Sequence, residues 1–338
     1  MQRKFSKLCT GVAAAATGLS LTACGTAGAA SDDTTYSWKM TITVGAASTW
    51  YEAAELFAET LERESDGRMS VDVFPNEQLS AGNQAGGVEQ LMSGDKDFTY
   101  NSTIIYAAVD PRFGAINAPF LYTDYDQADA AISAGAEEAY QELTAEFGVH
   151  MLGFGESGFR QVTNNVRPIE APEDLEGIKI RIPEIGLLTD FYRGSGANPS
   201  TMNFAEVFTS LQQGTIEGQE NPMDVIDKAG MAEVQAYLTV WNYVYDPLIL
   251  GVNQELFDSL DPADQDIIQD AADEANAYQI QLNRDAEEVQ LEEQAELLDT
   301  TVLDEAQMAE FREAVQPLYD DYASVWGTDL IDAVTPED

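Results

Sequence analysis

Alternating apolar and polar positions predict three short strands in the first third of the chain, at 40–44, 69–73 and 98–102. Between these strands, apolar residues spaced three or four apart predict helices at about 51–65 and 84–93, each followed closely by a glycine. The order strand, helix, strand, helix, strand is typical of an α/β fold with a mainly parallel sheet.

The middle of the chain continues in the same way. An Ala-rich helix is predicted at 127–147, and apolar, strand-like segments lie at 149–154 and 158–163. A further strand at 178–182 alternates Ile with Lys179 and Arg181, and a helix at about 186–195 follows it. The segment Asn203-Phe-Ala-Glu206 resembles a capping box that opens a helix at 207–213.

The last third of the chain is mostly helical. Asp261 followed by Pro262 predicts the start of a long helix to about residue 297, roughly 50 Å long at 1.5 Å per residue. A helix of that length is expected to brace two domains, and the alternative is a coiled-coil seam. Pro317 is expected to end or kink a further helix that begins near Glu305. The apolar face of the long helix is predicted at positions 268, 271, 275, 278, 282, 286 and 289.

The N-terminal segment has the pattern of an export signal, with a positive start, a short apolar core at 12–21 and the ending Leu-Thr-Ala-Cys24. This ending resembles a bacterial lipobox, in which Cys24 is lipidated and anchors the protein to the membrane, outside the cytoplasm, in the periplasm or on the cell surface. The alternative is an ordinary signal peptide that is cut after a small residue such as Ala30. Residues 24–37 are then expected to form a flexible tether.

Composition narrows the range of functions. The 338 residues include 60 Asp and Glu against 16 Lys and Arg, a net charge of −44, and 44% of residues are hydrophobic. Such an acidic chain is a poor partner for nucleic acid, because phosphate binding needs a basic face. One His leaves little for zinc sites or His-based triads, and two Cys are too few for a disulfide scaffold. We therefore predict no catalytic residues, no metal and no cofactor.

The few cations show where an anion could bind. Three of the 16 Lys and Arg lie before residue 24, and four of the others fall within 160–181. Arg suits a carboxylate because its planar fork makes two parallel hydrogen bonds. Arg181 is expected at the end of an apolar strand, where α/β sheets usually bind ligands, and Arg160 could reach the same cleft. Arg167 and Lys179 are interpreted as structural, and the alternative for all four is pairing with surface acids.

Five motifs occur in the order found in one family. They are Phe74-Pro-Asn-Glu-Gln-Leu, Gly158-Phe-Arg-Gln-Val-Thr-Asn-Asn, Asp174-Leu-Glu-Gly-Ile-Lys-Ile-Arg-Ile-Pro, Asn203-Phe-Ala-Glu-Val-Phe and Glu217-Gly-Gln-Glu-Asn-Pro. Over about 38–325 the chain resembles the solute-binding proteins of TRAP transporters, DctP type.

The resemblance implies two α/β domains, hinged around a cleft, and a long helix across both, as in periplasmic binding proteins. We assign 38–156 with about 252–300 to domain I and the bridging helix. Domain II and the C-terminal helices then take 157–251 with about 301–330, and the signal peptide takes 1–23.

The resemblance also implies site residues. Arg181 matches the arginine that holds the ligand's carboxylate, Arg160 a second contact, Asn221 a hydrogen-bond partner and Phe204 a wall of the pocket. The other domain is expected to contribute Tyr100, Asn101 and Ser102. Trp50 and Trp241 are candidates for stacking on a sugar ring, although large aromatic residues more often fill the core. The loop 80–87 departs from the family's common form, which puts contacts from Asn83 or Gln84 in doubt.

The resulting hypothesis is an extracytoplasmic receptor that delivers an organic acid anion to the integral membrane subunits of a TRAP transporter. The ligand is a sugar acid such as a uronate or aldonate, which the aromatic residues near the cleft slightly favour, or a C4-dicarboxylate. The alternatives are a sensory lipoprotein on the same fold and, less favoured, a sugar-acid-processing enzyme. The chain carries no serine-hydrolase, zinc or phosphate-loop motif that such an enzyme would use.

Overall fold

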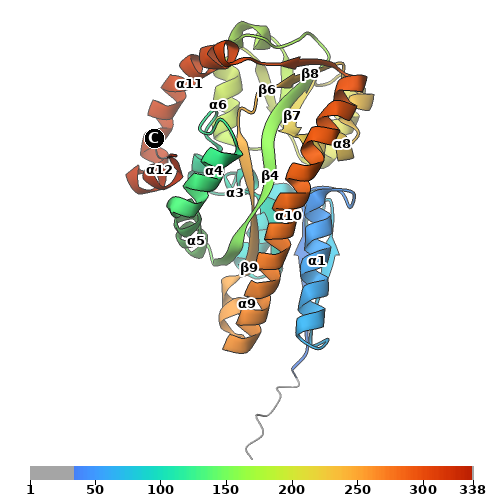
Figure 1. Cartoon of the computed structure of the whole chain (residues 1–338), viewed down its shortest axis with the longest axis vertical. Coiled ribbons are helices and arrows are strands. Elements are labelled where there is room, and N and C mark those ends of the chain that lie inside the picture. The colour runs from blue at the N-terminus through green and yellow to red at the C-terminus, as the bar shows by residue number, and fades with distance from the viewer. Residues whose placement is uncertain (1–33, 337–338) are drawn as a thin grey trace, which may run out of the picture. The chain divides into compact units, whose positions relative to one another are not determined.

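A mixed sheet of ten strands runs through residues 34–336, the part of the chain that this computed structural model describes (Figure 1). The predicted signal peptide and Cys24 lie outside the described residues. The first strand begins at Tyr36, within the predicted range of the tether, because Tyr36 and Ser37 already pair with Met69 and Ser70.

The elements alternate as expected for an α/β fold, which confirms the predicted fold class. The strands are β1 (Tyr36–Thr41), β2 (Met69–Phe74), β3 (Phe98–Ser102), β4 (Val149–Asn164), β5 (Lys179–Ile182), β6 (Asn198–Thr201), β7 (Gly218–Pro222), β8 (Tyr237–Val240), β9 (Tyr245–Asn253) and β10 (Asp299–Val302). The helices are α1 (Thr49–Glu64), α2 (Gln84–Ser93), α3 (Thr103–Tyr106), α4 (Tyr125–Ala131), α5 (Glu137–Ala145), α6 (Gly186–Gly194), α7 (Val207–Gln212), α8 (Met223–Lys228), α9 (Gln254–Asp258), α10 (Pro262–Leu297), α11 (Glu305–Trp326) and α12 (Thr328–Val334). None of the helices in the described range has the length and apolar composition needed to cross a bilayer.

Two groups of parallel strands are joined by two long antiparallel ones. The strand order is β2-β1-β3-β9-β4-β7-β5-β6, and β8 pairs with both β4 and β10. β1 is parallel to β2 and β3, as predicted, and β5 is parallel to β6 and β7. β9 and β4 lie between the two groups and connect them into one sheet.

The predicted strands at 149–154 and 158–163 form one strand, β4. Its pairing with β9 is interrupted twice, between Met151 and Phe154 and between Glu156 and Gly158. Gly158 has a φ of +92°, which residues with a Cβ rarely adopt. Such bulges bend a strand and release backbone groups from the ladder. The bent β4 can therefore pair with strands in both halves of the sheet.

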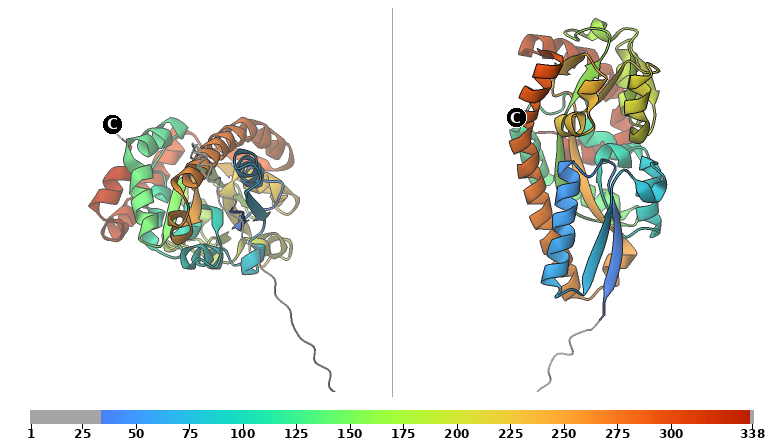
Figure 2. Two further views of the ribbon diagram at one scale, coloured as in Figure 1. Left: turned by 90° about the horizontal axis from the view of Figure 1, so that it is seen from below. Right: turned by 90° about the vertical axis from the view of Figure 1, so that its right-hand side faces the viewer.

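The helix α10 confirms the predicted long helix and covers 36 residues from Pro262. It packs beside α1 along one half of its length and beside α8 near its C-terminal end (Figures 1 and 2). Its buried face differs from the predicted stripe, because Tyr278 and Val289 are 38% and 55% exposed. The predicted apolar face holds only in the first part of the helix, at Ile268, Ala271 and Ala275.

Amide side chains form the buried face of α10 beyond Ala275. They are Asn276, Gln279, Asn283, Gln290 and Gln294. Gln279 donates to the carbonyl oxygen of Glu156 (2.6 Å) and accepts from its backbone nitrogen (2.7 Å). These are backbone groups at a bulge of β4, where the strand ladder cannot satisfy them, so the helix needs amides there and not apolar residues.

Two local predictions were wrong. The helix predicted at 127–147 is divided into α4 and α5 by a π-helical turn, Ile132–Ala136, that contains Gly135 at φ 154°. Asn203 does not cap its own helix, because its side-chain oxygen accepts from the backbone nitrogen of Gln84 (3.3 Å). Of the two effects predicted for Pro317, an end of the helix does not occur, because α11 continues to Trp326.

Replacing Gln279 with alanine is expected to lower the free energy of unfolding by about 2–6 kcal/mol. The change leaves a buried N–H and a buried carbonyl of Glu156 without partners, and each such group costs about 1–3 kcal/mol. Urea denaturation would measure the loss. Gln281→Ala is the matched control, because Gln281 is exposed and its side chain bonds only to Asp285. Equal effects of the two changes would contradict the role assigned to the buried amides.

Candidate ligand-binding site

The carboxyl ends of β1, β3, β5 and β7 meet around a small cavity, as expected for parallel strands of an α/β sheet. Its free volume is about 20 Å³, on the order of one water molecule. An organic acid can therefore enter only if the walls move apart. The cavity is lined by Thr43, Val44, Trp50, Gln84, Ser102, Ile104, Ile105, Arg160, Arg181, Pro183, Phe204, Asn221 and Val225.

Arg181 is a buried cation that forms no ion pair with any of the described residues. Only 1% of its surface is exposed. Its guanidinium donates to the carbonyl oxygen of Met202 (2.7 and 3.0 Å) and to Gln84 Oε1 (3.3 Å), which are neutral acceptors. Burial lowers the pKa of Arg181 to about 10, against the attraction of Glu220 and Glu206 and with a further lowering by Arg160. No carboxylate is thus in direct contact with the buried guanidinium of Arg181, and an anion placed there would stabilise its charge.

Arg160, the second predicted arginine, lies in the same cavity but is already paired. Its Nε and Nη2 donate to the carboxylate of Glu220 (2.5 and 2.8 Å), and its Nη1 donates to Asp246 Oδ2 (2.6 Å). All three groups are buried. Burial lowers the pKa of Arg160, but the two carboxylates outweigh it and raise the pKa above its ordinary value. The charge of Arg160 is consequently neutralised within the protein.

Neighbouring side chains hold these two arginines in place. Asn221 Oδ1 accepts from Arg160 Nη2 (3.1 Å), and the Tyr243 hydroxyl donates to Glu220 Oε2 (2.6 Å). Ser102, at the end of β3, donates to Asp246 Oδ1. The network therefore links β3, β4, β7 and β9 directly beneath the cavity.

Gln84, which the sequence left in doubt, holds the other side of the cavity. Its Oε1 accepts both from Arg181 and from the backbone nitrogen of Phe204 (3.0 Å). Gly87, in the first turn of the same helix, packs closely on Glu77, because a Cβ there would lie 2.2 Å from Glu77 Oε2. The glycine-rich segment 80–87 thus ends in the turn of α2 that holds Gln84 against Arg181.

The cavity includes six of the nine predicted ligand contacts: Arg181, Arg160, Asn221, Phe204, Ser102 and Trp50. Sequence reasoning missed Thr43, Val44, Ile104, Ile105, Pro183 and Val225. Each of these lies within a few residues of the end of β1, β3, β5 or β7. Ligands usually bind at the carboxyl ends of the parallel strands in an α/β sheet, and applying this expectation to every parallel strand, not to β5 alone, would have found these residues.

The other three predicted contacts, Tyr100, Asn101 and Trp241, do not line the cavity. Tyr100 is buried in β3, and Asn101 bonds to Glu77 Oε1 (2.7 Å) and to the backbone nitrogen of Thr43 (2.9 Å). Trp241 packs among aromatic rings, with its ring centre 4.5 Å from that of Tyr243. Their environment is that of core residues.

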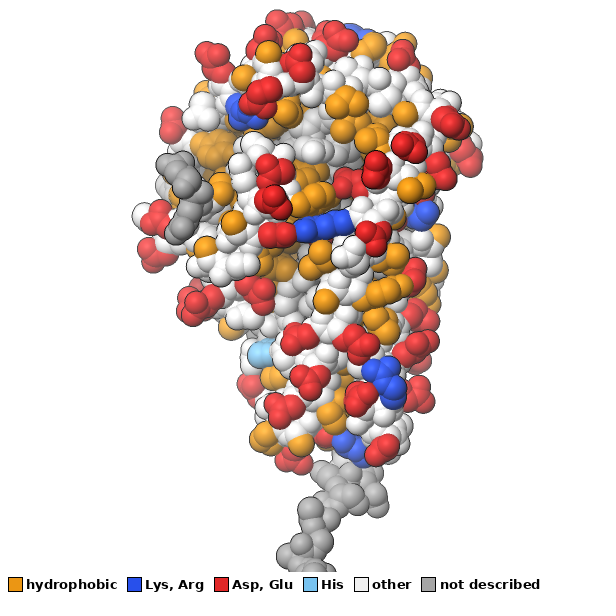
Figure 3. All heavy atoms as spheres, viewed as in Figure 1, with side chains coloured by type: hydrophobic (Ala, Val, Ile, Leu, Met, Phe, Trp, Pro, Cys, Tyr) orange, Lys and Arg blue, Asp and Glu red, His pale blue; other side chains and the backbone are white. Residues whose placement is uncertain are grey.

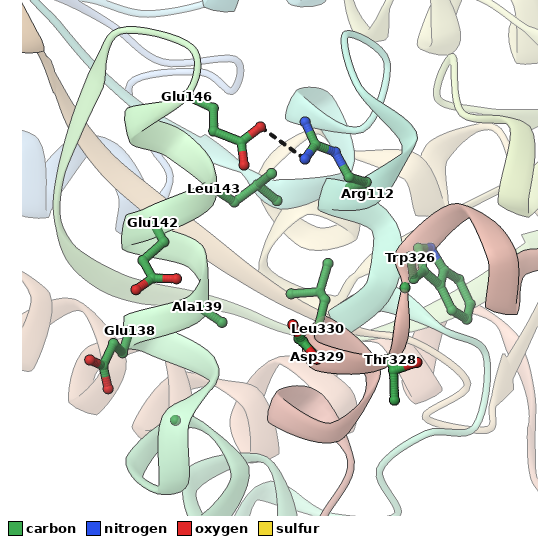
Figure 4. A pocket seen from close by; sticks show the side chains of 12 residues that line it. Arg112, Glu138, Ala139, Glu142, Leu143, Glu146, Trp326, Thr328, Asp329 and Leu330 are labelled. Atoms are coloured by element: carbon green, nitrogen blue, oxygen red, sulfur yellow. Dashed lines mark ion pairs between the residues drawn. The ribbon is translucent and has the colours of Figure 1, made fainter.

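A much larger groove of about 640 Å³ lies elsewhere on the surface, between α5 and the start of α12 (Figure 4). Its only cation, Arg112, pairs with Glu146 (2.9 Å) and Asp110 (3.0 Å). Glu138, Glu142 and Asp329 complete an acidic lining. Like charges of this kind repel an anion, so the groove does not suit an organic acid. Acidic side chains are also spread over the molecular face in Figure 3.

The buried Asp246 predicts a specific pH dependence of stability. Burial raises the pKa of Asp246 to about 6, although Arg160 opposes the shift. Between about pH 4 and 6 the folded protein then holds a proton that the unfolded chain has lost, so this group's contribution to stability falls as the pH rises. A shift of about two pKa units corresponds to about 3 kcal/mol.

We expect the advantage of the wild type over Asp246→Asn, in free energy of unfolding, to shrink by about 3 kcal/mol from pH 4 to pH 7. Urea denaturation at both pH values would measure it, with the exposed Asp72→Asn as control. A difference that is constant or grows over this range would contradict the assigned shift.

Comparisons with known proteins show which family the chain belongs to. Residues 40–325 match the model of bacterial extracellular solute-binding protein family 7, DctP. The chain is 30% identical over 306 residues to the sialic acid-binding periplasmic protein SiaP of Vibrio cholerae, covering 90% of this chain and 93% of that protein.

Two solved structures are also similar. One is a TRAP periplasmic solute-binding protein from Ralstonia eutropha with bound (S)-2-acetolactate (TM-score 0.85, 31% identity, 88% of this chain and 97% of that one). The other is the sugar acid binding protein DctPAm from Advenella mimigardefordensis in complex with galactonate (TM-score 0.84, 29% identity, 89% and 97%). The resemblance in the sequence motifs is thereby confirmed. The chain belongs to family 7 of the bacterial extracellular solute-binding proteins, the DctP-type receptors of TRAP transporters, which bind substrates and are not enzymes.

Proposed function

We propose that this receptor captures an organic acid by its carboxylate, which Arg181 holds, and that two domains close around the ligand. The observation that carries this proposal is the buried guanidinium of Arg181, which meets only neutral acceptors among the described residues. A carboxylate suits this position because two charge-assisted hydrogen bonds would satisfy the fork of the guanidinium. The similar proteins from Vibrio, Ralstonia and Advenella are described with carboxylic acids, which supports the same choice.

Closure is supported by the size and the placement of the cavity. Thr43, Trp50 and Ser102 come from the part of the chain predicted as domain I, and Arg181, Phe204 and Asn221 come from the predicted domain II. The free volume is on the order of one water molecule, so a ligand has to enter while these walls are apart. β4, β9 and α10 connect the two parts and would carry the movement.

Titration calorimetry with a panel of organic acids, on the wild type and on Arg181→Met, tests the proposal. We expect at least one acid to bind the wild type and to lose most of its affinity in the variant. Binding that survives the change would mean that the carboxylate lies elsewhere. The loaded receptor is then expected to dock on the integral membrane subunits of its transporter.

Lipidation of Cys24 is a separate part of the proposal. The motif Leu-Thr-Ala-Cys24 supports it, because the lipid is attached through a thioether to a cysteine thiol. Expression in a bacterium supplied with labelled fatty acid should label the wild type and not Cys24→Ser. A labelled Cys24→Ser protein, or an unlabelled wild type, would contradict the anchor.

A further inference from the structure

The geometry points to a narrower ligand class: we propose that the cavity binds a small monocarboxylate with a hydroxyl or oxo group on C2 and a short, branched aliphatic chain. A 2-hydroxy or 2-oxo acid of this kind differs both from a sugar acid and from a C4-dicarboxylate. The inference rests on the proposed role of Arg181 and deepens it. Charge, free polar groups and the apolar lining support it separately.

The charges in the cavity favour one carboxylate. Arg160 and Arg181 are its only cations, and Arg160 already donates to both Glu220 and Asp246. Only Arg181 is left to neutralise an incoming anion. A second carboxylate would have to approach the buried Glu220 and Asp246, and like charges in a site of low polarity repel strongly.

The free polar groups favour one further oxygen atom on the ligand. Of the eleven buried side-chain atoms that lack a hydrogen-bond partner in the described structure, two belong to cavity residues, Thr43 Oγ1 and Trp50 Nε1. Each can donate, and a buried donor without a partner is costly. An oxo or hydroxyl oxygen on the ligand would accept from them and remove that cost.

The other polar side chains of the cavity are largely engaged. Ser102 donates to Asp246, Gln84 Oε1 accepts from Arg181 and Phe204, and Asn221 uses both ends of its amide, donating to Gln219 (2.5 Å) and accepting from Arg160. A uronate or aldonate carries several hydroxyl groups, and each one buried without a partner weakens binding. Beyond Thr43 and Trp50, the bonds of the described cavity residues leave Gln84 Nε2 and one N–H of Asn221 free, which are few partners for the hydroxyl groups of a sugar acid.

An apolar wall completes the site. Val44, Ile104, Ile105, Pro183 and Val225 line the same cavity. A smaller space beside it shares Ile104, Ile105 and Pro183, so the apolar surface continues outward. Contact between this wall and alkyl groups of a ligand removes apolar surface from water and is favourable, whereas a hydroxyl group finds no hydrogen-bond partner on it. The small free volume favours a short chain, because the walls then have to separate least.

Titration calorimetry with five acids tests this inference: 3-methyl-2-oxobutanoate, 2-hydroxy-3-methylbutanoate, 3-methylbutanoate, succinate and glucuronate. We expect at least one of the first two to bind at least about tenfold more tightly than the other three, because the site would select both the C2 oxygen and the alkyl group. Trp50→Phe keeps an aromatic ring but removes the indole N–H, and should reduce the preference for the C2 oxygen about tenfold. Trp38→Phe, at a buried tryptophan outside the cavity, is the matched control.

The outcomes separate this inference from the proposed function. Tightest binding of succinate or glucuronate, lost in Arg181→Met, would overturn the ligand class and keep the carboxylate site. Binding of the branched acids that persists in Arg181→Met would overturn the carboxylate site. Equal affinity for 3-methylbutanoate and its 2-oxo analogue would overturn the role of Thr43 and Trp50. Failure of both C2-oxygenated acids to bind would overturn the ligand class.

Discussion

Arg181→Met is expected to remove ligand binding without making the unliganded protein less stable. The lost affinity should be about 2–5 kcal/mol, at least about 30-fold in Kd, because the ligand's carboxylate is left buried without a partner. The unliganded protein behaves differently, because Arg181 is buried and donates hydrogen bonds only to neutral acceptors among the described residues. The lowering of its pKa to about 10 corresponds to a desolvation cost of about 3 kcal/mol, which methionine does not carry.

Thermal unfolding with and without ligand would measure both effects in one experiment. The melting temperature without ligand should equal or exceed that of the wild type, and the rise on adding ligand should vanish. Arg167→Met is a suitable control, because Arg167 lies outside the cavity and bonds to backbone carbonyls of Asp174 and Glu176. A variant that is clearly less stable without ligand would show that Arg181 has a structural role.

Arg160→Met is expected to have the opposite effect on stability. It should lower the free energy of unfolding by about 3–5 kcal/mol, because Glu220 and Asp246 are then buried without a counter-charge. Urea denaturation of the two arginine variants side by side would show the contrast. Adding Glu220→Gln and Asp246→Asn to Arg160→Met should restore most of the loss, since buried ion pairs are often replaced by neutral groups at little cost. If the single variant is as stable as the wild type, the network is not structural.

Periodicity and end signals predicted most elements of the fold. The helix α2 begins and ends at its predicted residues, with Gly94 at φ +78° after its last turn, and α10 begins at the Asp-Pro pair. The predictions failed where a distant segment decides the local structure. Gln279 of α10 bonds to backbone groups at a bulge of β4, and Asn203 bonds to α2 instead of its own helix. Neither partner can be identified from a local window of sequence.

The lining of the candidate cavity was predicted only in part, again because segments distant in the sequence decide it. Cations are rare in this chain, so the position of Arg181 at the end of a strand was informative. The sequence could not show that Arg160 is paired and Arg181 is not. The chain has 60 acidic residues, and only the fold brings two of them, Glu220 and Asp246, to Arg160. The apolar wall was missed because Ile104 and Ile105 resemble ordinary core residues in the sequence.

The strand order also determines when the sheet can be completed during synthesis. β1, β2 and β3 are synthesised early, but the next neighbour of β3 in the sheet is β9. Phe98 therefore cannot pair until its partner Val252 has been synthesised. Until then β3 has an unpaired edge, which is a site for wrong pairing with other chains. Contacts so far apart in the chain also slow folding. A partly made chain that ends before Tyr245 should therefore aggregate or require a chaperone, whereas the completed chain closes this edge by itself.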